Sequence, residues 1–79
     1  MNTNELELLV EGRAAAESGR GARLREAARL SQSDLARIVG TTPATISRWE
    51  AGLRKPRGSL AVAYAQALRK VAQVIASHG

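Results

Sequence analysis

Cysteine is absent from this chain of 79 residues, which excludes disulfides and thiolate metal sites as sources of stability. Phenylalanine is absent too, and there is one Trp and one Tyr, so the core has to be built from Leu, Val, Ile and Ala. No apolar run approaches the roughly 20 residues that cross a membrane. The first residues carry acids where a signal peptide carries bases. We therefore expect a cytoplasmic protein with no membrane segment.

Reactive side chains are scarce as well. The chain has a single aspartate, Asp34, and a single histidine, the penultimate residue His78. No catalytic or metal-binding set can be assembled from them, so we expect neither an enzyme nor a cofactor or metal.

A core of this size supplies only a few kcal/mol of net stability, and dimerisation is the remaining source of support. Abundant alanine and the lack of strand-like alternation predict an all-α fold.

Charge is distributed unevenly along the chain, whose formal net charge is +5. Residues 1–18 hold four acids and one base, a net charge of −3, whereas residues 19–79 hold eleven bases and three acids, a net charge of +8. A basic body suits a polyanionic partner, although a solvated, arginine-rich surface would have the same composition. We therefore divide the chain into an acidic helical extension, residues 1–18, and a basic domain, residues 19–79.

Two short helices that meet at a sharp corner are predicted between Gln32 and Gly52. Ser31 can cap the first helix, and Gly40 can end it because glycine adopts positive φ without steric cost. Thr42 can cap the second helix, and Pro43 suits its first position, where no N–H is needed. The expected buried residues are Leu35, Ile38 and Val39 on the first helix and Ile46, Trp49 and Leu53 on the second.

The spacing of small and apolar residues makes this pattern specific. Counting Gln32 as the first position, Ala36 is fifth, Gly40 is ninth and Ile46 is fifteenth. Two closely crossing helices need a small residue at the contact, glycine at the corner and a branched residue in the angle, which is the helix-turn-helix. The matching motifs are Leu30-Ser31-Gln32, Gly40-Thr41-Thr42 and Thr45-Ile46-Ser47-Arg48-Trp49-Glu50. On these motifs, residues from about Gly19 to Arg69 resemble the DNA-binding domain of the Xre-type, lambda-repressor-like family of bacterial and phage regulators.

The resemblance implies a five-helix, lambda-repressor-like bundle, here with an extra N-terminal helix and a long C-terminal helix. It also implies a partly buried ion pair between Arg25 and Glu50 that braces the recognition helix. Family members commonly have glycine before the Leu-Ser-Gln motif, where this chain has Arg29. Either Arg29 takes a left-handed conformation, with a strain of about 1 kcal/mol, or the turn differs.

Two longer helices are predicted on either side of the motif. Asn4 can cap the first, and Ser59 can cap the last, which should reach about Ser77. A short isolated helix is marginal in water, so the first should pack on the body or on a second subunit, the alternative being a frayed extension. The residues expected to face inward are Leu6, Leu9, Val10 and Ala14 on the first helix, Leu24, Ala27 and Ala28 before the motif, and Leu60, Ala63, Tyr64, Ala67, Leu68, Val71, Val74 and Ile75 on the last.

The last helix carries more apolar residues than the helix-turn-helix core requires. Its second half is therefore expected to pack against the first helix, within one chain or across a dimer. The residues assigned to this packing are Leu6, Leu9, Val10, Val71, Val74 and Ile75.

A recognition helix places its N-terminal residues at base edges in the major groove. On the face opposite Ile46 and Trp49, Arg48 is the only long donor, and bidentate arginine on guanine is worth about 1–3 kcal/mol of discrimination. Pro43 stands where family members often have a polar base-reading residue, so part of the specificity is expected from DNA shape. The expected base contacts are Pro43, Ala44, Thr45, Ser47 and Arg48.

The resemblance places Gln32 and Thr42 at the sugar-phosphate backbone, beside helix N-termini whose N–H groups favour anions. The basic loop after the recognition helix adds salt-dependent anchors. Gln32 has a plainer alternative as a surface residue at a helix start, and Arg37 is equally a further contact or an exposed charge. The expected phosphate contacts are Gln32, Thr42, Arg54, Lys55 and Arg57.

These observations lead to three hypotheses. The first is a sequence-specific, double-stranded DNA-binding regulator, bacterial or phage, that binds an inverted repeat as a homodimer with residues 43–51 in the major groove and represses by blocking a promoter. The second is an antitoxin-type interaction module whose acidic extension neutralises a partner such as a toxin, with DNA binding for autoregulation. The third is an architectural or recombination-directionality factor that bends DNA strongly.

Overall fold

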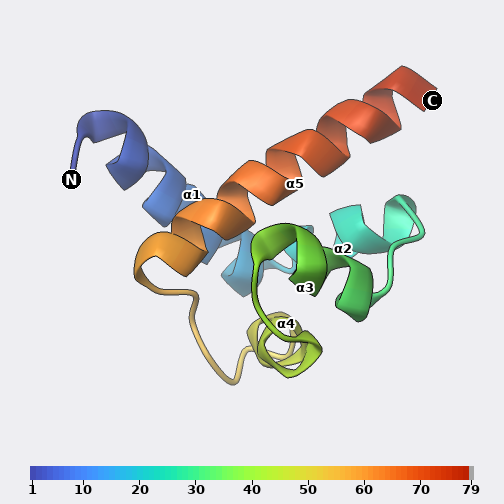
Figure 1. The fold of residues 1–79 in the computed structure, drawn as a ribbon, viewed down its shortest axis with the longest axis horizontal. Helices are drawn as coiled ribbons and strands as arrows, with labels where there is room; N and C mark the ends of the chain where they lie inside the picture. Colours follow the sequence, from blue (N-terminus) through green and yellow to red (C-terminus); the bar gives the residue numbers. More distant parts are fainter. Residues whose placement is uncertain (79) are drawn as a thin grey trace.

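Five helices, and no strand, make up residues 1–78, the part of the chain that the computed structural model describes. Helix α5 runs diagonally across the molecule, α1 crosses it, and α2, α3 and α4 lie on one side of it (Figure 1). The bounds are α1 Thr3–Ser18, α2 Arg20–Ala27, α3 Gln32–Val39, α4 Pro43–Glu50 and α5 Gly58–His78. The all-α, five-helix prediction is confirmed. No helix within residues 1–78 combines the length and apolar character that crossing a bilayer requires.

Local hydrogen bonds explain where α3 and α4 begin and end. The Ser31 hydroxyl accepts from the backbone N–H of Asp34 at 2.9 Å, and the Asp34 carboxylate accepts from the N–H of Ser31 at 2.9 Å, a complete capping box. Gly40 ends α3 with a φ of 91°, in the left-handed region that favours glycine. The Thr42 hydroxyl then caps α4 by accepting from the N–H of Thr45 at 3.2 Å.

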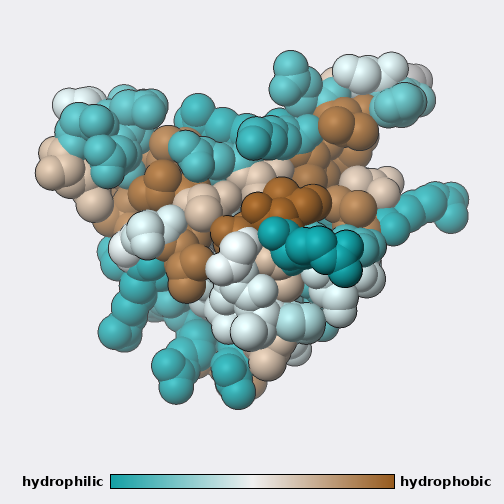
Figure 2. All heavy atoms as spheres, viewed as in Figure 1, coloured by the Kyte–Doolittle hydropathy of each residue, from teal (hydrophilic) through white to brown (hydrophobic). Residues whose placement is uncertain are grey.

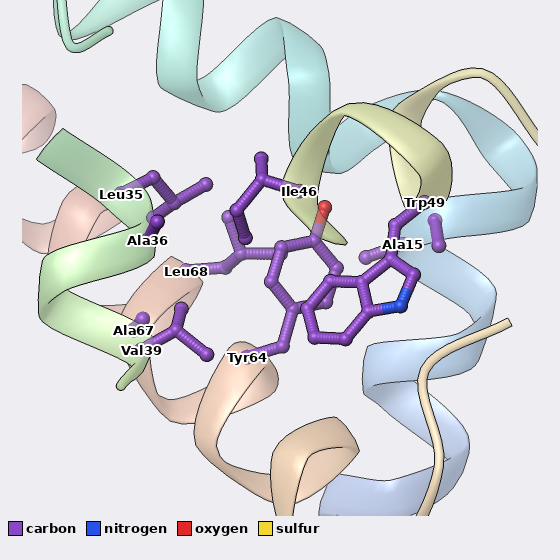
Figure 3. Packing of buried hydrophobic residues seen from close by; sticks show 10 residues of the cluster. Ala15, Leu35, Ala36, Val39, Ile46, Trp49, Tyr64, Ala67 and Leu68 are labelled. Carbon is purple, nitrogen blue, oxygen red and sulfur yellow. The ribbon is translucent and has the colours of Figure 1, made fainter. Parts of the chain in front are cut away.

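The hydrophobic core lies where α5 crosses α3 and α4, and α1 contributes two alanines to it. Figure 3 shows the rings of Trp49 and Tyr64 side by side in this core, with centroids 4.9 Å apart and planes inclined by 55°. The main core cluster consists of Ala15, Ala16, Leu35, Ala36, Val39, Ile46, Trp49, Tyr64, Ala67 and Leu68. Apart from one tryptophan and one tyrosine, the cluster is aliphatic, as the composition requires.

Tyr64 is the largest of the fully buried side chains. Its hydroxyl has no hydrogen-bond partner among the described residues, and burial raises the pKa of Tyr64 to about 12. Helix α2 can pass close to this hydroxyl only because Gly21 has no side chain. A Cβ at this position would collide with the tyrosine oxygen. The close approach of α2 to α5 thus covers a hydroxyl that no group in residues 1–78 pairs with.

The inward face of α1 differs from the prediction. Leu6, Val10 and Ala14 are exposed and Leu9 is half-buried, so the predicted stripe was wrong. The face that packs on α5 is instead made mostly of small residues: Leu8, Gly12, Ala15 and Ala16. Small residues win because the two helices approach very closely, and a Cβ on Gly12 would collide with the backbone carbonyl oxygen of Ala61.

The outer helices also begin at different residues from those predicted. Asn2, not Asn4, caps α1 by accepting from the N–H of Glu5 at 2.8 Å. Helix α5 begins at Gly58, which places Ser59 inside its first turn rather than at its cap. Both shifts are of one or two residues, within the range over which helix ends are defined.

Besides those of α1, four residues expected to face inward lie at the surface, and one of them is Val74 of α5, which is 54% exposed. Ile38 is exposed because Leu35, Ala36 and Val39 form the inward face of α3. Leu53 is exposed because α4 ends at Glu50 and the chain leaves the helix before reaching it. Ala27, in the last turn of α2, is exposed as well.

The second half of α5 does not meet the first half of α1 within one chain. Figure 1 places the start of α1 and the end of α5 at opposite ends of the molecule. Val71 is buried in its own chain, while Val74 and Ile75 lie beside the α2–α3 turn and line a hollow with Ala28. The intrachain alternative for this packing was therefore wrong.

Arg29 adopts the left-handed conformation, with a φ of 58°. Its N–H donates to the carbonyl of Glu26 at 3.0 Å, and the N–H of Leu30 donates to the carbonyl of Arg25 at 3.1 Å. These two bonds close the α2–α3 turn around a non-glycine residue, at a strain of about 1 kcal/mol. The turn geometry is thus kept without the glycine.

Candidate nucleic-acid interface

Helix α4 presents two contrasting faces. Ile46 and Trp49 are buried, whereas Pro43, Ala44, Ser47 and Arg48 are exposed. The helix lies at the lower edge of the molecule in Figure 1, with no other helix below it. Four of the five predicted base contacts are therefore open to a ligand, and Arg48 is a long donor among small side chains.

Thr45, the fifth predicted base contact, is half-buried. Its hydroxyl lies 2.9 Å from that of Thr42, so the two hydroxyls share a hydrogen bond at the start of α4. Thr42 is exposed beside the N-terminal N–H groups of this helix, which is a favourable place for an anion.

The loop of residues 51–57 places three cations next to α4. Arg54, Lys55 and Arg57 are all exposed, and hydrophilic side chains project from this lower edge in Figure 2. Together with Arg48 they surround a hollow of about 180 Å³, whose lining is completed by Thr45, Trp49 and Leu60. The predicted base-reading arginine and three of the five predicted phosphate contacts thus line one surface depression.

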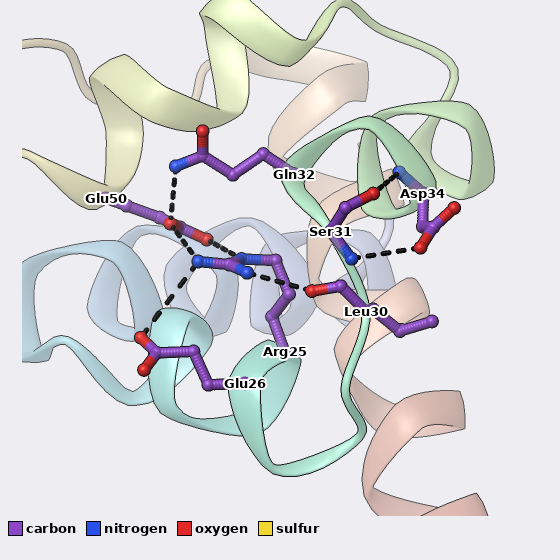
Figure 4. A network of polar contacts seen from close by, with 7 residues as sticks. All are labelled: Arg25, Glu26, Leu30, Ser31, Gln32, Asp34 and Glu50. Atoms are coloured by element: carbon purple, nitrogen blue, oxygen red, sulfur yellow. Dashed lines mark hydrogen bonds and ion pairs between the residues drawn. The ribbon is translucent and has the colours of Figure 1, made fainter.

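A polar network braces α4 from behind (Figure 4). Arg25 holds Glu50 in a bidentate pair, with Nε–Oε2 at 2.7 Å and Nη2–Oε1 at 2.9 Å. The third guanidinium nitrogen, Nη1, donates to the carbonyl of Leu30 at 2.8 Å, and Gln32 Nε2 donates to Glu50 Oε1 at 2.9 Å. Helix α4 is therefore connected to α2, to the turn that follows α2 and to the first residue of α3.

The electrostatics of this network favour the charged pair. Burial acts to raise the pKa of Glu50, but the hydrogen bonds from Arg25 and Gln32 outweigh it, and the pKa lies below its ordinary value. The hydrogen bond to Glu50 raises the pKa of Arg25 in turn. Both groups are ionised at neutral pH, so the brace is present under ordinary conditions.

The family model described as Helix-turn-helix matches residues 22–71. The chain belongs to the Xre-type, lambda-repressor-like helix-turn-helix family. It is accordingly a DNA-binding regulator. Comparisons with curated proteins and with solved structures gave no match.

The helix-turn-helix match covers the interface but not the whole fold. It begins within α2 and ends within α5, so it omits α1 and the last two turns of α5. Helix α1 nevertheless contributes Ala15 and Ala16 to the core. The omitted helix is thus packed into the body that presents the interface.

Gln32 takes a different position from that of a simple phosphate donor. It is half-buried, and one N–H of its amide is used on Glu50. An amide nitrogen has two N–H groups, so this bond leaves a second N–H as a donor. Arg37 is exposed on the last turn of α3, which fits either alternative considered for it.

Two residues that touch the basic loop were missed by sequence reasoning. Arg13 Nε donates to the carbonyl of Pro56 at 3.2 Å, and Glu17 lies 3.6 Å from the Lys55 ammonium group. Both are on α1, and neither pairing leaves a signal in the sequence because about 40 residues separate the partners. Among residues 1–78, no three His, Cys, Asp or Glu side chains gather as a metal site would require.

Proposed function

We propose that this protein is a sequence-specific transcriptional regulator of bacterial or phage origin that binds double-stranded DNA as a homodimer and represses by blocking a promoter. The observation that supports this most is the exposed face of α4, where Arg48 adjoins the three cations of the loop 51–57. A helix with this exposure fits the major groove, and the flanking cations fit the phosphates. Such a protein would work in the cytoplasm, where bacterial DNA lies.

In this proposal α4 reads bases with few polar groups. Arg48 donates to O6 and N7 of a guanine, and Ser47 donates to a base or phosphate. Ala44 and Thr45 offer methyl groups to a thymine methyl. Pro43 contacts the bases without a donor, so the remaining specificity comes from the width and stiffness of the DNA.

Phosphate contacts set the register of the helix in the groove. Thr42 and the second N–H of Gln32 would meet the backbone at the starts of α4 and α3. The loop cations Arg54, Lys55 and Arg57 would meet it on the other side of α4. Because each such contact releases counterions, affinity should fall steeply with salt.

A groove between α3 and α5 supports the homodimer. It has a volume of about 300 Å³ and an almost wholly apolar lining: Ala28, Leu30, Ile38, Ala67, Lys70, Val71 and Val74. It coincides with the hydrophobic band in the middle of Figure 2, and Ile38 and Val74 are 51% and 54% exposed on it. We propose that a second copy covers this groove through the outer half of α5, with Val74 and Ile75 from each copy at the centre.

The position of this groove suits an inverted repeat. It faces the viewer in Figure 2, whereas α4 lies at the lower edge, so groove and recognition helix are on adjacent faces. A two-fold axis that passes beside the groove and runs vertically in this view would leave both recognition helices on the same side of the dimer. Half-sites would be about one helical turn, ~34 Å, apart. Leu6, Leu9 and Val10 lie at the far end of α1 and are not needed for this contact.

Selection of bound sites from random duplex DNA tests the proposal. We expect an inverted repeat with half-site centres about one turn apart, and protection of both half-sites in a footprint. Arg48→Ala should relax the preference at one guanine in each half-site, with a loss of about 1–3 kcal/mol. Arg54→Ala is the matched control, because it should weaken all sequences alike and reduce the salt slope by about one. Uniform protection without sequence preference would contradict the proposal.

A second candidate, an antitoxin-type module, is supported by the outer face of α1. Leu6 and Val10 are exposed there, one helical turn apart, with Glu7 next to Leu6. An apolar stripe beside an acid, within the acidic extension of residues 1–18, fits a basic protein partner. This role would add to DNA binding rather than replace it.

Surface substitution tests this candidate, because deletion of α1 would remove Ala15 and Ala16 from the core. If the protein neutralises a toxic partner, its depletion should stop growth of the host. The Leu6→Lys/Val10→Lys variant should then fail to restore growth while binding DNA normally. Full restoration of growth by this variant would contradict the partner role.

A further inference from the structure

Helix α1 lies outside the helix-turn-helix match, yet it contacts the loop that carries the phosphate anchors. Arg13 Nε donates to the carbonyl oxygen of Pro56 at 3.2 Å, and the Glu17 carboxylate lies 3.6 Å from Lys55 Nζ. Arg13 and Glu17 are four residues apart and so share one face of the helix. One turn of α1 therefore meets two consecutive residues of the basic loop.

The other end of the same loop is tied to α4. The N–H groups of Leu53 and Arg54 both donate to the carbonyl of Arg48, at 2.9 and 3.3 Å. Pro56, the next-to-last residue of this otherwise exposed loop, is fully buried. The path of the loop is thus determined at three points: the end of α4, the buried proline ring and the Arg13 side chain.

We infer that α1 is part of the DNA-binding apparatus and that Arg13 is its positioning residue, which acts through the carbonyl of Pro56. Pro56 stands between Lys55 and Arg57 in the chain, so its carbonyl is close to both of the residues that carry these cations. Holding it still orders both cations before DNA arrives, so less conformational entropy is lost on binding. This inference rests on the proposed DNA-binding function and extends it to a helix outside the family match.

A direct contact between Arg13 and a phosphate would be a different role, and the two roles have different signatures. A positioning residue changes the mobility of the loop in the absence of DNA, and its effect on affinity depends on the cations that it positions. A phosphate contact leaves the free loop unchanged, and its effect is independent of the other cations. The experiment therefore needs one readout without DNA and one with it.

The readout without DNA is backbone 15N relaxation at the amides of Lys55 and Arg57. In the free wild-type protein we expect order parameters near 0.85, falling toward about 0.6 in Arg13→Met. Arg13→Lys keeps a charge and an N–H donor and should restore part of the order. Arg20→Met removes the same charge from an exposed position on α2 and should leave the loop unchanged. Unaltered loop order in Arg13→Met would overturn the inference, whether or not the protein binds DNA.

The readout with DNA is a double-mutant cycle on the selected duplex. Arg13→Met should weaken binding roughly two- to tenfold, the value of one hydrogen bond, and Arg20→Met should not. In the background of Arg57→Ala the same Arg13 substitution should cost clearly less, because one of the positioned cations is gone. Equal losses in both backgrounds would assign Arg13 to a direct phosphate contact and overturn the positioning role. Failure of wild type to select any sequence would instead count against the proposed function.

Discussion

Two arginine–carboxylate pairs in this protein have nearly the same geometry and opposite surroundings. Arg25 holds Glu50 with nitrogen–oxygen distances of 2.7 and 2.9 Å, and Arg69 holds Glu11 with two distances of 2.8 Å. The side chains of the first pair are 14% and 9% exposed, those of the second 54% and 34%. The first joins α2 to α4 behind the proposed DNA-binding face, whereas the second joins α1 to α5 at the surface.

This difference shows that the distance between two charged groups does not by itself determine how much an ion pair contributes to stability. Water solvates either member of the surface pair when the other is removed, so little stability is lost. Removal of one member of the inner pair leaves a charge that has lost most of its water and its counterion. The inner pair also holds Gln32 and the carbonyl of Leu30 in place, so its loss should propagate to the start of α3.

The largest expected effect is that of Glu50→Ala. It should lower the free energy of unfolding by roughly 3 kcal/mol, because Arg25 stays charged and loses its partner. Urea denaturation measures this as a lower midpoint. The double variant Arg25→Met/Glu50→Leu serves as the control, and it should recover part of the loss since no unpaired charge is left. A loss below about 1 kcal/mol for Glu50→Ala would remove the contrast between the two pairs.

Acid should weaken the inner pair in a pH window that is set by Glu50. Its pKa is lowered in the folded chain: burial acts against ionisation, but the hydrogen bonds from Arg25 and Gln32 outweigh it. The stabilisation is therefore complete above the unfolded-state pKa and is lost as pH falls through the folded-state value. Below about pH 5, wild type should lose stability faster than Glu50→Ala does. Parallel pH profiles for the two proteins would show that the carboxylate is not responsible.

Tyr64→Phe sharpens the comparison from inside the core, because the tyrosine hydroxyl is buried and has no hydrogen-bond partner within residues 1–78. Removing its hydroxyl should raise the free energy of unfolding by about 1 kcal/mol. The pKa of Tyr64 is raised to about 12, so wild type should also lose stability as pH rises from about 10 to 12. The phenylalanine variant should lack this alkaline loss. Destabilisation by Tyr64→Phe at neutral pH would mean that the hydroxyl has a stabilising role.

Glu11→Gln should have the smallest effect. It removes the charge of the surface pair and should cost less than about 1 kcal/mol, and salt should shrink that cost further. Thermal unfolding at low and high salt, with Arg69→Met as the partner variant, measures both quantities. A cost above about 2 kcal/mol that is insensitive to salt would make the two pairs equivalent. Burial would then not explain how much each pair contributes to stability.

The accuracy of the sequence predictions differs between the two halves of the fold for a physical reason. Helices α3 and α4 are delimited by contacts between residues at most four or five positions apart, such as the Ser31–Asp34 box and Gly40. Local chemistry of this kind can be recognised in the sequence. The family resemblance added the prediction of a pair between Arg25 and Glu50, and the structure places these two side chains in bidentate contact.

The prediction failed for α1 because its inward stripe was drawn through Leu6 and Val10 and left out Gly12. Leu6 and Val10 are larger than Gly12, but the crossing with α5 is so close that only a residue without a Cβ fits against Ala61. Which face of a helix is inward depends on how near its neighbour comes, and that distance is a property of the assembled fold. The same holds for Ile38, which shares its helix with three buried residues and is itself exposed.

The sequence by itself determined the corner between α3 and α4, the outward face of the recognition helix and the basic character of the loop after it, because each depends on residue types at short separations. Only the tertiary structure decided which side of α1 is buried, that Gln32 is shared with Glu50, and that Arg13 reaches the carbonyl of Pro56. These contacts join residues 18 to 49 positions apart. Their existence depends on how helices cross in three dimensions, which no spacing along the chain encodes.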